Sequence, residues 1–404
     1  SSSSSYATNF YTISLIFHDL LCILVVIGLL FQNFHCNFSI HTTSKLHQSK
    51  NNDNNDNNIF CNAASSDDFF IYEDYNQYDI RFIENITHPD NSHKGNDDKF
   101  GRSVAFTGYS PTITSSSSTT NIKFMLVGEE HASVNSENTW LPYAGAVHVY
   151  RYQYTDDNIV DNYVYDQGDL YNFTFVKSLF IQDYFNEDNC EYIDLNTSTY
   201  QSTYGYSRFG TSISFSSNEN LVAIGSRGFT VVLNGSEHDD SGAVFIMSYD
   251  PTNPDGNFSA VGTIVSPTRL LNEYNDIDDY DFGYSVSFVP DQPLLAIADH
   301  YFNHNGYHNG MVYFYQYSLN SDDQTYSFTY IRYLPGHSYN IHFGAALSFA
   351  QGLNLFAVGS PYRDGNNAWE EGQVDIFYFD LQYDNSDNTT ITDIIFWSNE
   401  EPLF

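Results

Sequence analysis

One three-part pattern occurs four times between residues 100 and 377, and this repetition constrains the possible folds more than any other feature of the chain. Each copy opens with a Phe-Gly pair, continues with an apolar run ending in Gly or Ala, and closes with Gly followed by mainly apolar residues. The first copy has FGRSVA at 100–105, MLVG at 125–128 and GAVHVY at 145–150. The later copies open at Phe209, Phe282 and Phe343.

Each part of the pattern is short, rich in Val, Ile, Phe and Tyr, and bounded by Gly, Asn, Asp or Ser. This is typical of a strand between turns, and the runs are too short for ordinary helices. The Gly before each third part indicates a tight turn or the close approach of another backbone. A fourth apolar run of similar length follows each copy, at 173–180, 260–265, 328–333 and 391–397.

Four strands per copy predict one four-stranded antiparallel sheet per copy. Such a sheet cannot bury both of its faces alone, so neighbouring sheets must stack on one another. Radial stacking leaves only short, protected sheet edges. We therefore predict an all-β fold, a β-propeller with four clear repeats and about five blades.

The order of these elements resembles the FG-GAP repeat of integrin alpha subunits and related propellers. The fourth copy comes nearest to the name-giving second element, with Val358-Gly359-Ser360-Pro361, whereas the third copy has Ala298-Asp299 at the equivalent place. The resemblance covers roughly 300 of the 404 residues. It implies an extracellular or membrane-tethered propeller that binds other proteins or matrix.

In integrins, the loop between the first two strands often carries alternating Asp residues that form a calcium cage. The corresponding loops here are 107–124, 216–220, 289–293 and 350–354, and none has that spacing of carboxylates. The chain therefore resembles the calcium-free variety of the repeat, and we expect no cofactor. A weaker candidate for a calcium site is the alternating set Asp276, Asp278, Asp279 and Asp281. It lacks the turn glycine of an EF-hand loop, so we favour a solvated connection.

The charge balance restricts the partners of the protein. Lys and Arg number 14 against 50 Asp and Glu, which gives a net charge of −36. Such a field repels phosphate backbones and anionic lipid, so we expect no nucleic-acid binding, and membrane contact only through an N-terminal segment. Basic protein surfaces and glycans remain as partners, although an acidic, soluble extracellular surface is the simplest interpretation.

The N-terminal part has a different composition. Residues 20–31 are a continuous run of apolar residues and Gly, the length of a signal-peptide hydrophobic region, and the wider stretch 11–34 could just cross a bilayer. We expect residues 1–34 to form a signal peptide or a signal-anchor helix; a buried helix of a globular domain is the alternative. Residues 35–66 are expected to be a disordered Asn/Asp-rich linker, and residues 67–404 the propeller.

Sequons and cysteines agree with passage through the secretory pathway. Seven N-x-S/T sequons are candidate glycosylation sites, at Asn37, Asn85, Asn172, Asn196, Asn234, Asn257 and Asn388. There is no CxxC motif, and the four cysteines include Cys61 and Cys190, a candidate disulfide between the linker and the first copy.

No pattern for catalysis is present, since GxSxG, HExxH and Gly-rich phosphate loops are all absent. Ser103, Ser212 and Ser285 occupy one strand position of the repeat, so a structural role is expected for them. His300, His304 and His308 recur at every fourth residue, which on a helix could present three imidazoles to a metal. The intervening Asn and Gly residues disfavour a helix, so we expect a solvent-exposed loop there.

Together these observations predict a non-catalytic, secreted or cell-surface interaction module that binds protein or glycan partners through loops on one face. The alternative is a structural glycoprotein packed into an extracellular filament or coat. A hydrolase that carries a propeller is the third and least favoured interpretation.

Overall fold

The computed structural model describes residues 62–64, 68–70, 85–89, 98–107, 122–136, 139–154, 171–185, 205–217, 220–233, 236–267, 281–304, 307–320, 322, 324–336, 341–362, 371–384, 389–398 and 401–402. The helix expected within 1–34, the linker up to residue 61 and the Cys61–Cys190 pair lie outside these residues. In the part of the chain that the structure describes, no helix combines the length and apolar character of a membrane span.

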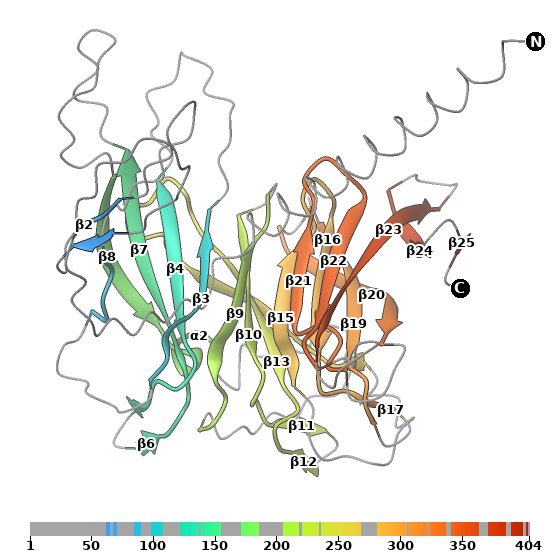
Figure 1. Ribbon diagram of the computed structural model, residues 1–404. Helices are drawn as coiled ribbons and strands as arrows, with labels where there is room; N and C mark the ends of the chain where they lie inside the picture. Colours follow the sequence, from blue (N-terminus) through green and yellow to red (C-terminus); the bar gives the residue numbers. More distant parts are fainter. Residues whose placement is uncertain are drawn as a thin grey trace, which may run out of the picture.

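Four antiparallel sheets, one per sequence copy, make up the molecule (Figure 1). Sheet I contains β3 (Phe100–Phe106), β4 (Lys123–Glu129), β7 (Ala146–Tyr154) and β8 (Tyr171–Leu179). Sheet II contains β9 (Phe209–Phe215), β10 (Leu221–Ser226), β13 (Ala243–Ser248) and β14 (Ser259–Val265). Sheet III contains β15 (Phe282–Phe288), β16 (Leu294–Asp299), β19 (Met311–Leu319) and β20 (Tyr326–Pro335). Sheet IV contains β21 (Ala346–Phe349), β22 (Leu355–Ser360), β23 (Gln373–Tyr383) and β24 (Ile391–Ser398), with β25 (Glu401–Pro402) at its edge.

The prediction of an all-β fold built from repeated four-stranded sheets is thus confirmed, including the fourth strand of each copy. Smaller elements connect or follow the strands of these sheets. Two-stranded hairpins connect the second and third strands of sheets I to III: β5 (Val134–Ser136) with β6 (Thr139–Leu141), β11 (Val231–Leu233) with β12 (Ser236–His238), and β17 (Asn303–His304) with β18 (Tyr307–His308). The short helix α2 (Ile181–Tyr184) follows β8. Near the N-terminus, β1 (Asn62–Ala64) pairs with β2 (Asp68–Phe70), so part of the expected linker forms a strand.

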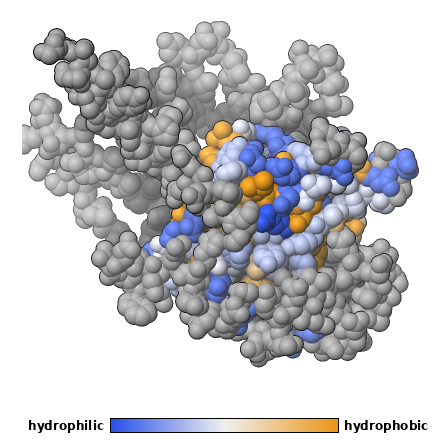
Figure 2. Space-filling model, turned by 90° about the vertical axis from the view of Figure 1, so that its right-hand side faces the viewer, coloured by the Kyte–Doolittle hydropathy of each residue, from blue (hydrophilic) through white to orange (hydrophobic). Residues whose placement is uncertain are grey.

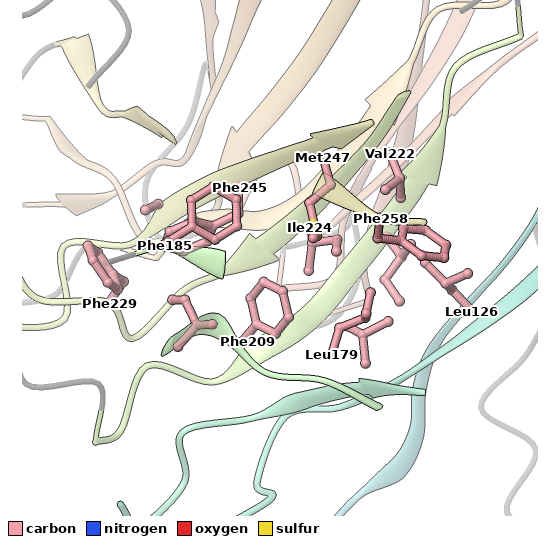
Figure 3. Packing of buried hydrophobic residues seen from close by; sticks show 14 of the residues in the cluster. Leu126, Leu179, Phe185, Phe209, Val222, Ile224, Phe229, Phe245, Met247 and Phe258 are labelled. Carbon is pink, nitrogen blue, oxygen red and sulfur yellow. The ribbon is translucent and has the colours of Figure 1, made fainter. Parts of the chain in front are cut away.

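Neighbouring sheets pack face to face, and three separate apolar cores fill the spaces between them. The first core joins Leu126 and Leu179 of sheet I to Ile224 and Phe245 of sheet II, as Figure 3 shows. The second core lies between sheets II and III, and the third between sheets III and IV. Every residue of β10 is buried, because sheet II is covered on both faces. This explains why its sequence is a continuous apolar run and not an alternation of apolar and polar residues.

The Phe-Gly pairs of sheets II, III and IV each dock onto the preceding sheet, and we call this contact the Phe-Gly joint. Gly145 forms a parallel bridge with Phe209, and Gly242 forms the equivalent bridge with Phe282. A Cβ atom on Gly145 would overlap the backbone of Phe209, so no larger residue fits. The expected close backbone approach at the Gly before each third strand is therefore confirmed at these positions.

Candidate functional site

Charged and aromatic side chains from three equivalent positions of the repeat meet where the first strands of the sheets lie side by side. We call them the junction cluster. The positions are the residue before each Phe-Gly pair (Lys99, Arg208, Asp281, His342), the residue after it (Arg102, Thr211, Tyr284, Ala345), and the residue after the second strand (Glu130, Arg227, His300, Pro361). The cluster lies toward the lower end of the molecule in Figure 1, where hairpins β5–β6, β11–β12 and β17–β18 begin.

Glu130 is the anionic centre of the cluster on the side of sheet I. Its side chain is buried and lies 3.2 Å from Lys99 Nζ, 3.4 Å from Arg102 Nε and 3.3 Å from Arg227 Nε. Thr211 Oγ1 donates a further hydrogen bond of 3.3 Å to Oε2. Burial alone would raise the pKa of Glu130, but the charges of Arg227, Arg102 and Lys99 outweigh burial and lower the pKa to about 2. The carboxylate is therefore ionised across the ordinary pH range.

Arg227 links this centre to a second carboxylate, Asp281, which lies 3.3 Å from its guanidinium. Burial raises the pKa of Asp281, while Arg227 opposes the shift. The ring of Tyr284 packs between cations, since the guanidinium carbons of Arg102 and Arg227 lie 5.2 and 5.5 Å from its centroid. Residues from sheets I, II and III thus contact one another directly, which fixes the three sheets relative to each other.

His300 does not lie in an exposed loop, so that expectation is wrong. Its ring stacks on Tyr284 with centroids 3.6 Å apart, and its Nδ1 lies 3.4 Å from Asp281. His300 is buried because it directly follows the buried strand β16. The β17–β18 hairpin begins only further along the chain. His304 and His308 belong to that hairpin, so the three histidines do not share a helical face.

A second buried histidine, His342, lies beside His300 with ring centroids 5.4 Å apart. Burial, together with His342 and the nearby arginines, lowers the pKa of His300 to about 3. Burial and the neighbouring His308 lower the pKa of His342 to about 4. A general acid or base works best with a pKa near the working pH. At neutral pH the junction cluster instead holds an ionised Glu130 and two neutral imidazoles.

Sheet IV forms a different site. In the described part of the chain, no Phe-Gly pair docks onto the surface of sheet IV that would complete a Phe-Gly joint. In sheets I and II, a Cβ atom on Gly128 or Gly225 would overlap the Gly carbonyl oxygen of the next sheet. The equivalent Gly359 would meet only Ala346, at 3.4 Å. A pocket of about 450 Å³ opens at this place, lined by Ala345, Ala346, Gly359, Ser360, Pro361, Glu371, Gly372, Gln373 and Val374.

The face of sheet IV beside this pocket is apolar and exposed. Val374, Ile376 and Tyr378 alternate along β23 on one face and are 50%, 41% and 44% exposed. The residues equivalent to Val374 and Ile376 in sheet I are Val147 and Val149, which are fully buried against sheet II. Figure 2 faces this side of the molecule and shows hydrophobic residues at the surface among hydrophilic ones. We call the pocket and this apolar row the open joint.

Of the other residues singled out in the sequence, Asn85, Asn172 and Asn257 are exposed. Asp281 is engaged by Arg227, as described. The remaining candidates lie outside the described residues: Asn37, Asn196, Asn234, Asn388, Cys61, Cys190, Asp276, Asp278 and Asp279. The junction cluster itself was not anticipated from sequence. The feature of the sequence that could have indicated this cluster is that charged residues recur at equivalent positions inside an otherwise apolar repeat.

The class of protein that the fold defines is an all-β protein of stacked, repeated four-stranded sheets. No protein-family model matches the chain, and a comparison with curated proteins finds no match either.

Proposed function

We propose that this chain is a non-catalytic interaction module of the FG-GAP, propeller type, acting outside the cell or at its surface. The open joint carries the proposal. Sheets I to III each bury this surface under the first strand of the next sheet, whereas sheet IV presents the same surface to solvent. An exposed apolar patch beside a formed groove is typical of a protein-binding surface.

The expected ligand of the open joint is a protein strand that contains a Phe-Gly pair. The groove beside Gly359 and Gly372 has the backbone geometry that accepts Phe209-Gly210 in sheet I. Gly372 has φ +75°, close to the φ +83° of Gly145. Main-chain contacts in the groove and side-chain contacts with Val374 and Ile376 would together hold such a strand.

The absence of catalysis is part of the same proposal, and two features support it. The sequence contains no catalytic motif, and Glu130 and His300 of the junction cluster have pKa values of about 2 and about 3, far from neutrality. An extracellular location agrees with the net charge of −36 and with exposed sequons at Asn85, Asn172 and Asn257.

Self-assembly into a filament or coat is the second candidate function, and one observation favours it. The chain carries its own unused Phe-Gly pair in β3, where Gly101 has φ +86° and no described atom within 4 Å of an added Cβ. The Phe-Gly pair of one copy could occupy the open joint of the next copy. Such a head-to-tail contact generates a ring if the rotation between copies closes, and an open chain of molecules if it does not.

The test uses a labelled synthetic peptide of residues 98–107 and the full chain. Fluorescence anisotropy should show saturable binding to the wild-type protein and at least tenfold weaker binding to Gly359→Val, in which the new side chain blocks the groove. A peptide carrying Gly101→Val is the matched control and should not bind. Equal binding by the wild-type protein and Gly359→Val would contradict the proposal.

Light scattering coupled to size-exclusion chromatography separates the two candidates. Head-to-tail assembly predicts a mass that grows with protein concentration and returns to the monomer in Gly359→Val. A monomer at all concentrations that still binds the peptide indicates recognition of a different protein.

A further inference from the structure

Three side chains with metal-binding atoms converge on sheet I, away from the junction cluster and the open joint. They are His88, Glu129 and His148, and their ligand atoms all lie within 4.8 Å of one another. Both imidazoles point the same atom at the same oxygen: His88 Nε2 lies 3.0 Å and His148 Nε2 2.6 Å from Glu129 Oε2. Two of the three residues, Glu129 and His148, are buried.

These residues depart from the repeat. The place of His148 is taken by Phe245 in sheet II and by Tyr313 in sheet III, and each of those rings packs on the Phe of its own Phe-Gly pair. The place of Glu129 is taken by Ser226 in sheet II, by Asp299 in sheet III and by Ser360 in sheet IV. Among the four sheets, sheet I therefore combines a His with a carboxylate at these two positions, and the strand pairing places both on one face.

Among the described residues, the carboxylate of Glu129 contacts the two imidazoles and no Lys or Arg side chain. The charge of a buried carboxylate is compensated by a protonated histidine, by another paired cation or by a metal ion. Glu130, one residue further on, satisfies the same requirement with three cationic side chains.

The surroundings also orient the ligands. Ser178 lies opposite His148 in the β7–β8 ladder, with its hydroxyl 2.9 Å from His148 Nδ1. The hydroxyl oxygen can accept a hydrogen bond from Nδ1–H, and the lone pair of Nε2 is then directed at the site. The rings of His88 and Phe100 meet edge to face at 5.7 Å. The side chain of His88 is 24% exposed, which leaves a solvent-facing side for an additional water ligand.

We propose that His88, Glu129 and His148 form a binding site for a divalent transition metal, with zinc the best match to two imidazoles and one carboxylate. Tetrahedral ligands at zinc lie about 3.3 Å apart, so His88 Nε2 and His148 Nε2 each need to move away from Glu129 Oε2 by less than about 1 Å to admit the ion. The ion ties the segment 85–89, which precedes the first repeat, to the outer face of sheet I. Its role is to hold that segment in place.

The test uses the full-chain protein after its metal ions have been removed with EDTA and dialysis. ZnCl₂ or CoCl₂ is then added alone. One zinc per chain should remain after dialysis, and cobalt should give the visible absorption of a low-coordinate site. His88→Gln and Glu129→Gln should each weaken zinc binding at least tenfold, whereas the matched control His238→Asn, on hairpin β11–β12, should bind as the wild type does. Calcium should not compete, because imidazole nitrogen is a poor ligand for it.

A second measurement does not depend on the folding of variants. Zinc should protect His88 of the wild-type protein, which is 24% exposed, from modification by diethylpyrocarbonate, read by peptide mass spectrometry, and should leave His238 reactive. Failure to retain zinc, unchanged binding in both variants, or equal modification with and without zinc would each overturn the proposal and leave a hydrogen-bonded His-Glu-His group.

Discussion

Ser103 in sheet I donates a hydrogen bond of 2.8 Å from its hydroxyl to the carbonyl oxygen of Gly210 in sheet II. The equivalent Ser212 makes a 2.9 Å bond to Gly283 of sheet III. The serine of the repeat is therefore part of the Phe-Gly joint and connects sheet I to sheet II and sheet II to sheet III. Sheet IV has Ala346 at this position, so its open joint lacks the hydroxyl donor.

Restoring this hydroxyl should strengthen docking at the open joint. Ala346→Ser supplies the donor that Ser103 and Ser212 provide elsewhere, and a hydrogen bond of this kind contributes about 0.5–1.5 kcal/mol. The affinity for the peptide of residues 98–107 should rise by about twofold to tenfold, measured by anisotropy. Ala260→Ser, in β14 of sheet II and outside the open joint, is the control and should leave the affinity unchanged. An unchanged affinity for Ala346→Ser would mean that the peptide binds in another way.

The stability of the two glycine variants should differ because only one joint is occupied. Gly225→Ala forces a methyl group into the carbonyl oxygen of Gly283 and should lower the free energy of unfolding by about 1–3 kcal/mol or more. The methyl group of Gly359→Ala meets only Ala346, so this variant should change the free energy of unfolding by less than about 0.5 kcal/mol. Urea denaturation followed by circular dichroism measures both. Equal losses would show that the joint of sheet II is not as tightly packed as described.

Arg227 should be far more important for stability than an arginine in an exposed ion pair. Arg227→Met leaves Glu130 and Asp281 buried beside less positive charge and should cost about 3–5 kcal/mol. Arg332→Met removes a 3.0 Å pair with the half-exposed Asp393 and should cost about 1 kcal/mol or less. The same denaturation experiment compares the two variants, and a larger loss for Arg332→Met would refute the buried network.

His300 and His342, the buried histidines of the junction cluster, should make the protein less stable in mild acid. Their pKa values are about 3 and 4 in the folded chain and about 6.5 when unfolded, so the unfolded state takes up protons that the native state does not. Their contribution is complete above pH 6.5 and is lost as the pH falls toward 4. The raised pKa of Asp281 has the opposite effect on the dependence of stability on pH. The lowered pKa of Glu130 affects stability at lower pH, between about 4.5 and 2.

His342→Gln isolates the histidine contribution. Its free energy of unfolding should fall less steeply between pH 6.5 and 4.5 than that of the wild type, while His238→Gln should keep the wild-type slope. Urea midpoints at several pH values provide the measurement. A wild-type stability that does not change over this interval would contradict the assignment of both imidazoles as neutral.

Exposed sequons should carry glycans if the chain passes through the secretory pathway. Expression in secreting eukaryotic cells, followed by removal of N-glycans, should lower the mass, and Asn85→Gln and Asn257→Gln should each remove one glycan. Asn257 lies in an exposed turn before β14, where the acceptor is accessible. A secreted protein whose mass does not change on deglycosylation would remove the support that these sequons give to an extracellular location.

Local patterns predicted much of the fold, because a strand between turns is specified by a few consecutive residues. The Phe-Gly openings at Phe209 and Phe282, and the fourth run 260–265, all became strands at the expected places. The close approach at Gly145 was also predicted, since only glycine tolerates it. The exposed loop expected at His300 was wrong, because the chain composition around it carries no information about Tyr284, which covers it from another strand.

The amino-acid sequence by itself determined the number of repeated sheets, their strands and the glycines at which sheets approach one another, since these depend on residue type and short-range spacing. Only the tertiary structure decided that Lys99, Glu130, Arg227 and Asp281 meet, that His88 joins Glu129 and His148, and that sheet IV keeps its joint open. Each of these depends on how separate sheets stack, and stacking brings together residues from separate copies through contacts that no local pattern encodes.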